Sequence, residues 1–178
     1  MKKRNVSLKN KRRLDAYVIV GDPNMGKSSV ARHLYGATKG PYNRTAGNIL
    51  IKPIKLLNGN IIRVGIEGYQ SLQEAGVSPQ QFANYLQKLK QRPDAILFTL
   101  QLNPRPKLNA GAQAYFIALR RILHIVATAV LDVNPHAVHN FPNSRTFQSF
   151  PKGVPMVGSA VITTNELARS VRQFFQWV

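Results

Sequence analysis

The sequence predicts an α/β fold of three layers, in which helices cover both faces of a mostly parallel sheet. Short continuous apolar runs at 16–20 and 95–100 are typical of strands that are buried on both faces. Segments with apolar residues at helical spacing alternate with these runs along the chain. Asn58 and Gly59 separate two further strand-like runs, and this dipeptide favours a tight antiparallel turn. We therefore expect one antiparallel hairpin strand in an otherwise parallel sheet.

The amino-terminal part of the chain divides into an arm and the start of a domain. Residues 1–13 carry seven basic residues and no acid, so like-charge repulsion predicts a flexible basic arm. The remaining residues, 14–178, are about the length of one domain. Within that domain, a strand at 16–20 leads through a glycine-rich turn at 21–28 into a helix at 29–35.

The middle of the chain carries clear boundary signals. Strand-like runs at 49–57 and 61–66 flank the Asn-Gly turn. Ser78, Pro79 and Gln81 form a capping-box sequence, which predicts that a helix begins there. A buried strand at 95–100 follows, and then a helix over 110–123.

The carboxy-terminal third is less regular. Periodicity alone allows 124–131 to be either more helix or a strand, and we predict a strand at 125–131. The segment 133–153 contains three prolines and predicts a long loop, after which 154–162 is expected to form a strand. A capped helix should begin near 163–166, and Trp177 should seal it against the core.

Charge and composition limit the class of protein. The 178 residues include 25 Lys and Arg but only 7 Asp and Glu, a net charge of +18. This imbalance predicts an acidic partner: RNA, an anionic membrane surface or an acidic protein. The absence of cysteine excludes disulfides, thiolate zinc sites and thiol lipidation. No apolar run approaches about 20 residues and no secretory signal is evident, so we expect a soluble cytoplasmic protein without a transmembrane segment.

The segment 21–28 has the pattern Gly-x4-Gly-Lys-Ser, which is typical of a phosphate-binding loop. In such loops the backbone N–H groups surround the phosphates, the lysine reaches the terminal phosphates, and the serine hydroxyl ligates Mg²⁺. The expected position between a buried strand and a helix satisfies the structural context of the motif. The predicted nucleotide-binding residues of this segment are Gly21, Asp22, Pro23, Asn24, Met25, Gly26, Lys27, Ser28 and Ser29.

An antiparallel hairpin follows this first helix directly. This order of elements resembles that of the Ras-like small GTPases, a family of P-loop NTPases. The resemblance covers about residues 15–178. It implies that Thr45 senses the terminal phosphate through Mg²⁺, so that Ser28 and Thr45 are the metal ligands. It also implies that Gly68 is the glycine of the second switch, and that Ser159 and Ala160 back the guanine base.

The chain departs from this family at three positions. The family's Asp-x-x-Gly reads Gly-Ile-Glu-Gly at 65–68, and we expect Glu67 to substitute for the missing acid. The glutamine that orients the attacking water is shifted to Gln70, which predicts slow hydrolysis. The Asn-Lys-x-Asp motif is absent from 131–135, which leaves Asp132 or Asn134 to contact the base. The predicted catalytic residues are therefore Lys27, Glu67 and Gln70.

These observations predict a switch that binds GTP and GDP with Mg²⁺ and hydrolyses GTP slowly or only with a partner. One alternative is a GTPase-like scaffold without turnover, which binds RNA, a membrane or an acidic protein through its basic surface. Another is an ATP-binding P-loop protein, either an ATPase or a small-molecule kinase. The basic side chains at 88–92, 105–107 and 120–121 are expected to form either a polyanion-binding surface or solvated helix ends.

Overall fold

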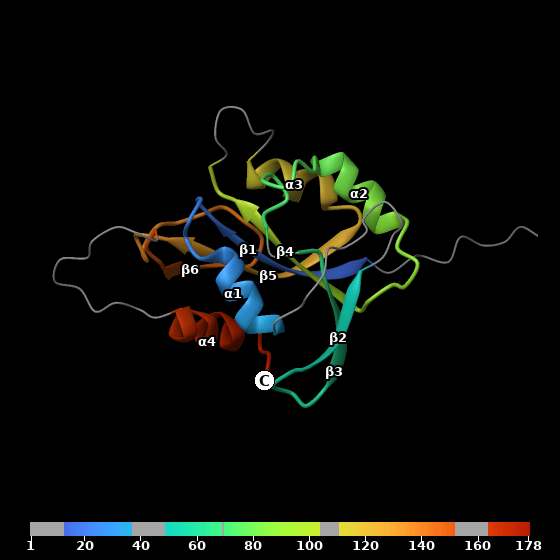
Figure 1. Ribbon diagram of the computed structural model, residues 1–178, viewed down its shortest axis with the longest axis horizontal. Helices are drawn as coiled ribbons and strands as arrows, with labels where there is room; N and C mark the ends of the chain where they lie inside the picture. The colour runs from blue at the N-terminus through green and yellow to red at the C-terminus, as the bar shows by residue number, and fades with distance from the viewer. Residues whose placement is uncertain (1–12, 37–48, 69, 104–110, 152–163) are drawn as a thin grey trace, which may run out of the picture.

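A six-stranded sheet forms the centre of the molecule, and helices lie on both of its faces (Figure 1). The computed structural model describes residues 13–36, 49–68, 70–103, 111–151 and 164–178. The elements in chain order are β1 (Leu14–Gly21), α1 (Lys27–Tyr35), β2 (Leu50–Lys55), β3 (Ile61–Ile66), α2 (Pro79–Gln87), β4 (Ala95–Gln101), α3 (Ala112–Leu119), β5 (Leu123–Asp132), β6 (Ser144–Gln148) and α4 (Thr164–Phe174). The predicted α/β class is confirmed.

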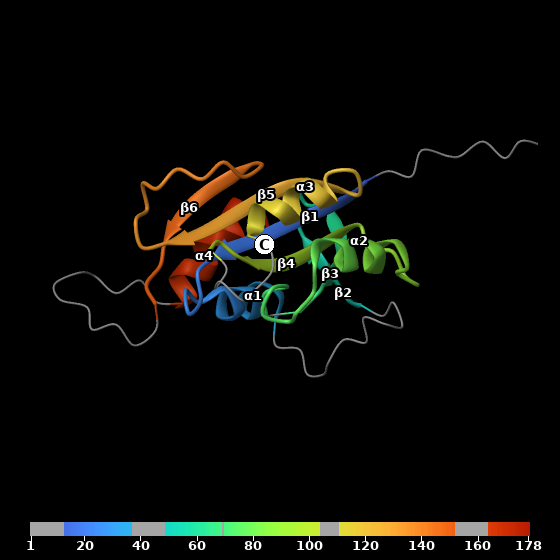
Figure 2. The same cartoon turned by 90° about the horizontal axis from the view of Figure 1, so that it is seen from above.

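The strands follow the order β2-β3-β4-β1-β5-β6 across the sheet (Figure 2). Every neighbouring pair is parallel except β2 and β3, which form the predicted antiparallel hairpin. Strand β1 lies between β4 and β5, and Gly21 at its end is level with Gln101 and Leu131. The carboxyl ends of these three strands therefore meet at one edge of the sheet, which we call the carboxyl edge.

Side chains of β1 alternate between two hydrophobic cores, as the period of a strand requires. Tyr17 and Ile19 pack against α1 and α4 on one face. Ala16 and Val18 pack against α2 and α3 on the other face. The sheet is thus covered on both sides, which explains the continuous apolar runs in its central strands.

The capping box predicted at the start of α2 is present. The Gln81 backbone N–H donates to Ser78 Oγ at 3.2 Å, and the Ser78 backbone N–H donates to Gln81 Oε1 at 2.7 Å. At the other end of the chain, the buried Trp177 ring packs edge-on against Tyr17, with 4.9 Å between the ring centroids. Trp177 therefore seals the last helix onto the core, as expected.

The structure corrects the second half of the chain in two places. The predicted strand at 125–131 is confirmed, but β5 already begins at Leu123, so α3 ends at Leu119 rather than at residue 123. The predicted loop at 133–153 is wrong, because it contains the edge strand β6. Only Phe147 of β6 is fully buried, so the apolar pattern that marks a strand is missing. The predicted strand at 154–162 and residues 1–12 of the arm lie outside the described residues.

Candidate phosphate-binding site

The 21–28 loop joins β1 to α1 at the carboxyl edge, and two of its glycines have defined structural roles. A Cβ on Gly21 would lie 3.0 Å from the Leu131 carbonyl oxygen, so a larger residue would require β5 to move slightly away from the end of β1. Gly26 precedes α1 with φ of 81°, a left-handed conformation that other residues adopt at a cost. Asn24, also left-handed at φ of 67°, is among the residue types that tolerate this region.

The Lys27 side chain lies against the loop rather than in solvent. Its Nζ donates to the Asp22 carbonyl oxygen at 2.7 Å, and the residue is only 5% exposed. Burial lowers the pKa of the Lys27 ammonium, and the negative charges of Glu74 and Asp22 oppose this shift without cancelling it. A phosphate anion beside this ammonium would supply the charge compensation that the protein alone supplies incompletely.

Helix α1 adds hydrogen-bond donors to the same place. The backbone N–H groups of its first turn, beginning at Lys27, Ser28 and Ser29, have no intrahelical acceptor, and no acidic side chain lies in that turn. The positive end of the helix dipole also favours an anion here. The loop, the helix start and Lys27 together form a candidate site for phosphate groups.

A small hollow marks the site on the surface. Its volume is about 160 Å³, roughly the space of five water molecules. It is lined by Asn24, Gly26, Lys27, Ser28, Ser29 and Glu74. A hollow of this size fits phosphate groups but not a nucleoside, so a base and a ribose bound here would lie outside it.

Glu74 is the site residue that the sequence analysis did not select. It lies in the turn that follows β3, and its Oε2 accepts from the Ser71 backbone N–H at 3.2 Å. Its Oε1 accepts from Gln101 Nε2 at 3.0 Å. Burial would raise the pKa of this carboxyl, but the hydrogen bonds from Ser71 and Gln101 and the charge of Lys27 together lower it. Glu74 is therefore held as a carboxylate beside Lys27.

The turn that carries Glu74 is fixed to β4. Gln73 Nε2 donates to the Gln101 carbonyl at 3.1 Å, and the Gln101 backbone N–H donates to Gln73 Oε1 at 3.0 Å. The Leu72 backbone N–H also donates to the Thr99 carbonyl at 3.1 Å. Because β4 is the direct neighbour of β1, these bonds hold Glu74 beside the 21–28 loop.

Glu67 lies elsewhere. Val64 and Ile66, which precede Glu67 along β3, face α1 and α4. Because side chains alternate along a strand, Glu67 faces α2 and α3 on the opposite side of the sheet. Glu67 is 1% exposed. Burial of the Tyr115 hydroxyl on α3 and, to a smaller extent, the charge of Glu67 raise the pKa of Tyr115 to about 12. Since α1 begins on the other face and β4 separates β3 from β1, the fold does not bring Glu67 to Ser28.

The other predicted residues of the second switch also lie outside the hollow. Gly68 is buried, whereas Gln70 is exposed, and neither residue lines the hollow. Thr45, Ser159 and Ala160 lie outside the described residues, so their predicted roles stay predictions.

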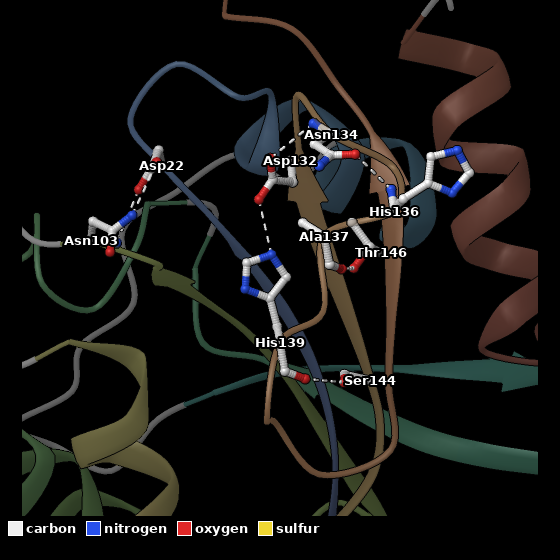
Figure 3. A network of polar contacts seen from close by, with 9 residues as sticks. All are labelled: Asp22, Asn103, Asp132, Asn134, His136, Ala137, His139, Ser144 and Thr146. Carbon is white, nitrogen blue, oxygen red and sulfur yellow. Dashed lines mark hydrogen bonds and ion pairs between the residues drawn. The ribbon is translucent and has the colours of Figure 1, made fainter.

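Asp22 points towards the loop after β4 rather than into the hollow. The Asn103 backbone N–H donates to Asp22 Oδ1 at 3.0 Å, and Asn103 Nδ2 donates to Oδ2 at 3.4 Å (Figure 3). Helix α1, which follows β1, and helix α3, which follows β4, lie on opposite faces of the sheet. The contact between Asp22 and Asn103 therefore joins the loop after β1 to the loop after β4, at the point where the following helices go to opposite faces of the sheet. Such points are common ligand sites in α/β folds.

Asp132 and Asn134 belong to a separate network at the end of β5 (Figure 3). Asp132 Oδ1 accepts from the Asn134 backbone N–H, and Oδ2 lies 2.9 Å from His139 Nε2. Asn134 is exposed, and its Oδ1 accepts from the His136 backbone N–H at 3.0 Å. Ser149 after β6 connects this network to the 21–28 loop, because its backbone N–H donates to the Asp132 carbonyl and its Oγ donates to the Met25 carbonyl, both at 2.8 Å.

The described residues contain neither a preformed metal cluster nor a helix that could cross a membrane. They contain no group of three or more His, Asp or Glu side chains arranged to hold a metal ion, so a cation at the site would need phosphate oxygens as further ligands. The longest helix in this part of the chain has 11 residues, and none is long and apolar enough to cross a membrane.

Comparison of the chain with protein-family models, with curated proteins and with solved structures finds no match.

Proposed function

We propose that this protein is a GTPase-like switch that binds the phosphates of a guanine nucleotide, with Mg²⁺, in the 21–28 loop. The observation that carries the proposal is the buried Lys27 ammonium beside the free N–H groups of α1 at the carboxyl edge. Buried cations without full compensation are uncommon in a core and typical of anion sites. Slow or partner-dependent hydrolysis is supported by Gln70, which does not line the hollow.

The donor set suits Mg²⁺. Ser28 offers a hydroxyl oxygen in the first turn of α1, half-buried at the hollow, and Mg²⁺ prefers oxygen ligands that include phosphates and water. When bound, the ion would neutralise charge on the terminal phosphates. Lys27 and the backbone of the loop hold those phosphates in place, and Gly26 keeps side-chain atoms away from them.

Recognition of a guanine base by Asp132 depends on the hydrogen bonds that this side chain already makes. Each carboxylate oxygen of Asp132 already has one partner, Asn134 or His139, so a base would have to share this side chain with them. Selectivity between GTP and ATP is therefore an outcome of the binding experiment. Binding of ATP alone would replace the GTPase-like switch with an ATP-binding P-loop protein.

The test is calorimetric titration with GTP, GDP, ATP and ADP, each with Mg²⁺, at physiological ionic strength. A protein of charge +18 attracts any polyphosphate, so a matched control is required. Lys27→Ala and Lys55→Ala remove the same charge, but Lys55 is an exposed residue of β2 outside the hollow. We expect loss of binding in Lys27→Ala only. Equal affinities for the wild type and both variants would show nonspecific attraction and refute the proposal.

A second candidate function rests on the opposite edge of the sheet, where the strands begin. Two hollows of about 650 and 620 Å³ adjoin each other there and share Leu14 and Arg92 as lining residues. Arg13 lines the first hollow and Arg121 the second, and all three arginines are exposed. We propose that this basic edge binds RNA, because its exposed guanidinium groups can pair with backbone phosphates, while Asp15 and Asp94, which also line the first hollow, are paired with His124 and Arg63.

Salt dependence tests this candidate. We expect single-stranded RNA to bind with an affinity that falls steeply with salt, and the double substitution Arg92→Gln and Arg121→Gln to reduce the log–log slope by about 1.4. The matched control replaces Arg145 and Arg169, two exposed arginines on β6 and α4. Equal slopes in the two double variants would refute RNA binding at the basic edge, and binding to anionic vesicles instead of RNA would replace it.

A further inference from the structure

The geometry points to Glu74 as the carboxylate that holds Mg²⁺, together with Ser28, at the phosphates of the bound nucleotide. This inference rests on the proposed function and adds to it the acid that the second-switch motif lacks. Glu74, Ser28 and Lys27 line the same hollow, and the charge of Glu74 acts on the Lys27 ammonium. Glu74 is also exposed, so a ligand in the hollow reaches it.

Among the seven acids of the chain, all of them described, only Glu74 lines the hollow. Asp15 pairs with His124 and Asp94 with Arg63 at the edge where strands begin, far from the 21–28 loop. The remaining four lie on the opposite sheet face, in the two polar networks or on α4: Glu67, Asp22, Asp132 and Glu166.

The hydrogen bonds of Glu74 prepare it for a cation. The Ser71 backbone N–H and Gln101 Nε2 each donate to a different carboxylate oxygen, at 3.2 and 3.0 Å. A carboxylate has about four lone-pair positions, so both oxygens retain capacity for a metal or its water. Because the Gln73 side chain binds both the backbone N–H and the carbonyl of Gln101, the neighbouring carboxylate is also fixed in position. Mg²⁺ is commonly held by one or two carboxylates together with substrate phosphates.

The charge of Glu74 should affect nucleotide affinity in opposite directions with and without Mg²⁺. A carboxylate beside phosphate groups repels them, so Glu74 should weaken the binding of nucleotide without a metal. When Mg²⁺ lies between the carboxylate and the phosphates, the same charge becomes favourable. A residue that serves only to fold the turn would affect binding in the same direction with and without the metal.

The experiment measures nucleotide affinity with Mg²⁺ and with EDTA for the wild type, Glu74→Gln and Glu67→Gln. Glu74→Gln keeps an oxygen acceptor for the Ser71 N–H and so preserves much of the turn. In the wild type and Glu67→Gln we expect Mg²⁺ to increase affinity about tenfold or more. In Glu74→Gln the increase should fall to about twofold, and affinity in EDTA should equal or exceed that of the wild type.

Three outcomes overturn the assignment. An unchanged Mg²⁺ effect in Glu74→Gln shows that Glu74 does not hold the ion. Equal losses of affinity with and without Mg²⁺ show a structural role instead. Loss of the Mg²⁺ effect in Glu67→Gln, with Glu74→Gln unaffected, transfers the role to Glu67. Failure of the proposed function is distinguishable from all three, because the wild-type chain would then bind nucleotide no better than Lys27→Ala.

Discussion

Replacing Lys27 by methionine separates a functional lysine from a structural one. Methionine has nearly the length and apolar stem of lysine but no charge. Burial lowers the pKa of Lys27, which means that the folded protein disfavours the ammonium relative to water. The variant loses one hydrogen bond, from Nζ to the Asp22 carbonyl, worth about 1 kcal/mol. Relief of the buried charge offsets that loss, so we expect the free energy of unfolding to change by less than about 1 kcal/mol.

Nucleotide binding should respond very differently to the same substitution. Hydrogen bonds to charged groups contribute about 1.5–3 kcal/mol, which is roughly 10- to 150-fold in affinity. Urea denaturation followed by circular dichroism measures the first effect, and calorimetric titration with Mg²⁺ and GTP measures the second. Lys27→Met should therefore retain stability and lose binding. A stability loss above about 2 kcal/mol with unchanged affinity would show that Lys27 is a structural cation and would refute our reasoning.

Three further predictions follow from individual residues. Bound phosphate should raise the lowered pKa of Lys27, so affinity should be constant at lower pH and fall as pH rises above the pKa of the free protein. Titrations from neutral pH up to the ordinary lysine pKa of about 10.4 test this, and Lys27→Arg, which stays charged, should remove the effect. Gly26→Ala introduces a side chain at φ of 81° and should reduce stability by about 1–2 kcal/mol in urea denaturation. The Tyr115 hydroxyl donates to the Val77 carbonyl, so Tyr115→Phe should lower the unfolding free energy by about 1 kcal/mol. Mg²⁺-dependent nucleotide binding should not change, and an effect on binding would count against the separation of α3 from the site.

Local signals were sufficient to predict most of the fold. The Asn-Gly hairpin, the capping box at Ser78 and the buried runs of β1 and β4 each combine a turn or cap with an unambiguous period. Strand β6 could not be predicted in this way. It is an edge strand of five residues with one fully buried side chain, and its partner β5 lies only a loop away in sequence. Its formation depends on backbone pairing with Thr128–Asp132, which sequence periodicity does not report.

The site was predicted in part for the same reason. The 21–28 motif is contiguous, so its residues come together through local structure alone. The position of an acid opposite it depends instead on strand order and on the face to which a side chain points. Glu67 directly follows β3, and this position predicts an acid at the carboxyl edge. Because side chains alternate along a strand, however, Glu67 points to the face covered by α2 and α3. Glu74 reaches the hollow through the pairing of Gln73 with Gln101, a contact between distant residues that no local pattern indicates.

The most direct test of the account is to locate the bound nucleotide. Amide chemical-shift mapping of the isotope-labelled protein, titrated with Mg²⁺ and GTP, distinguishes the carboxyl edge from the basic edge within one experiment. We predict the largest shifts at residues 24–29 and at Glu74, with small shifts at Arg92 and Arg121. Shifts concentrated at Arg92 and Arg121, with the 21–28 loop unchanged, would show that the nucleotide binds only to the general positive charge and would contradict the central claim.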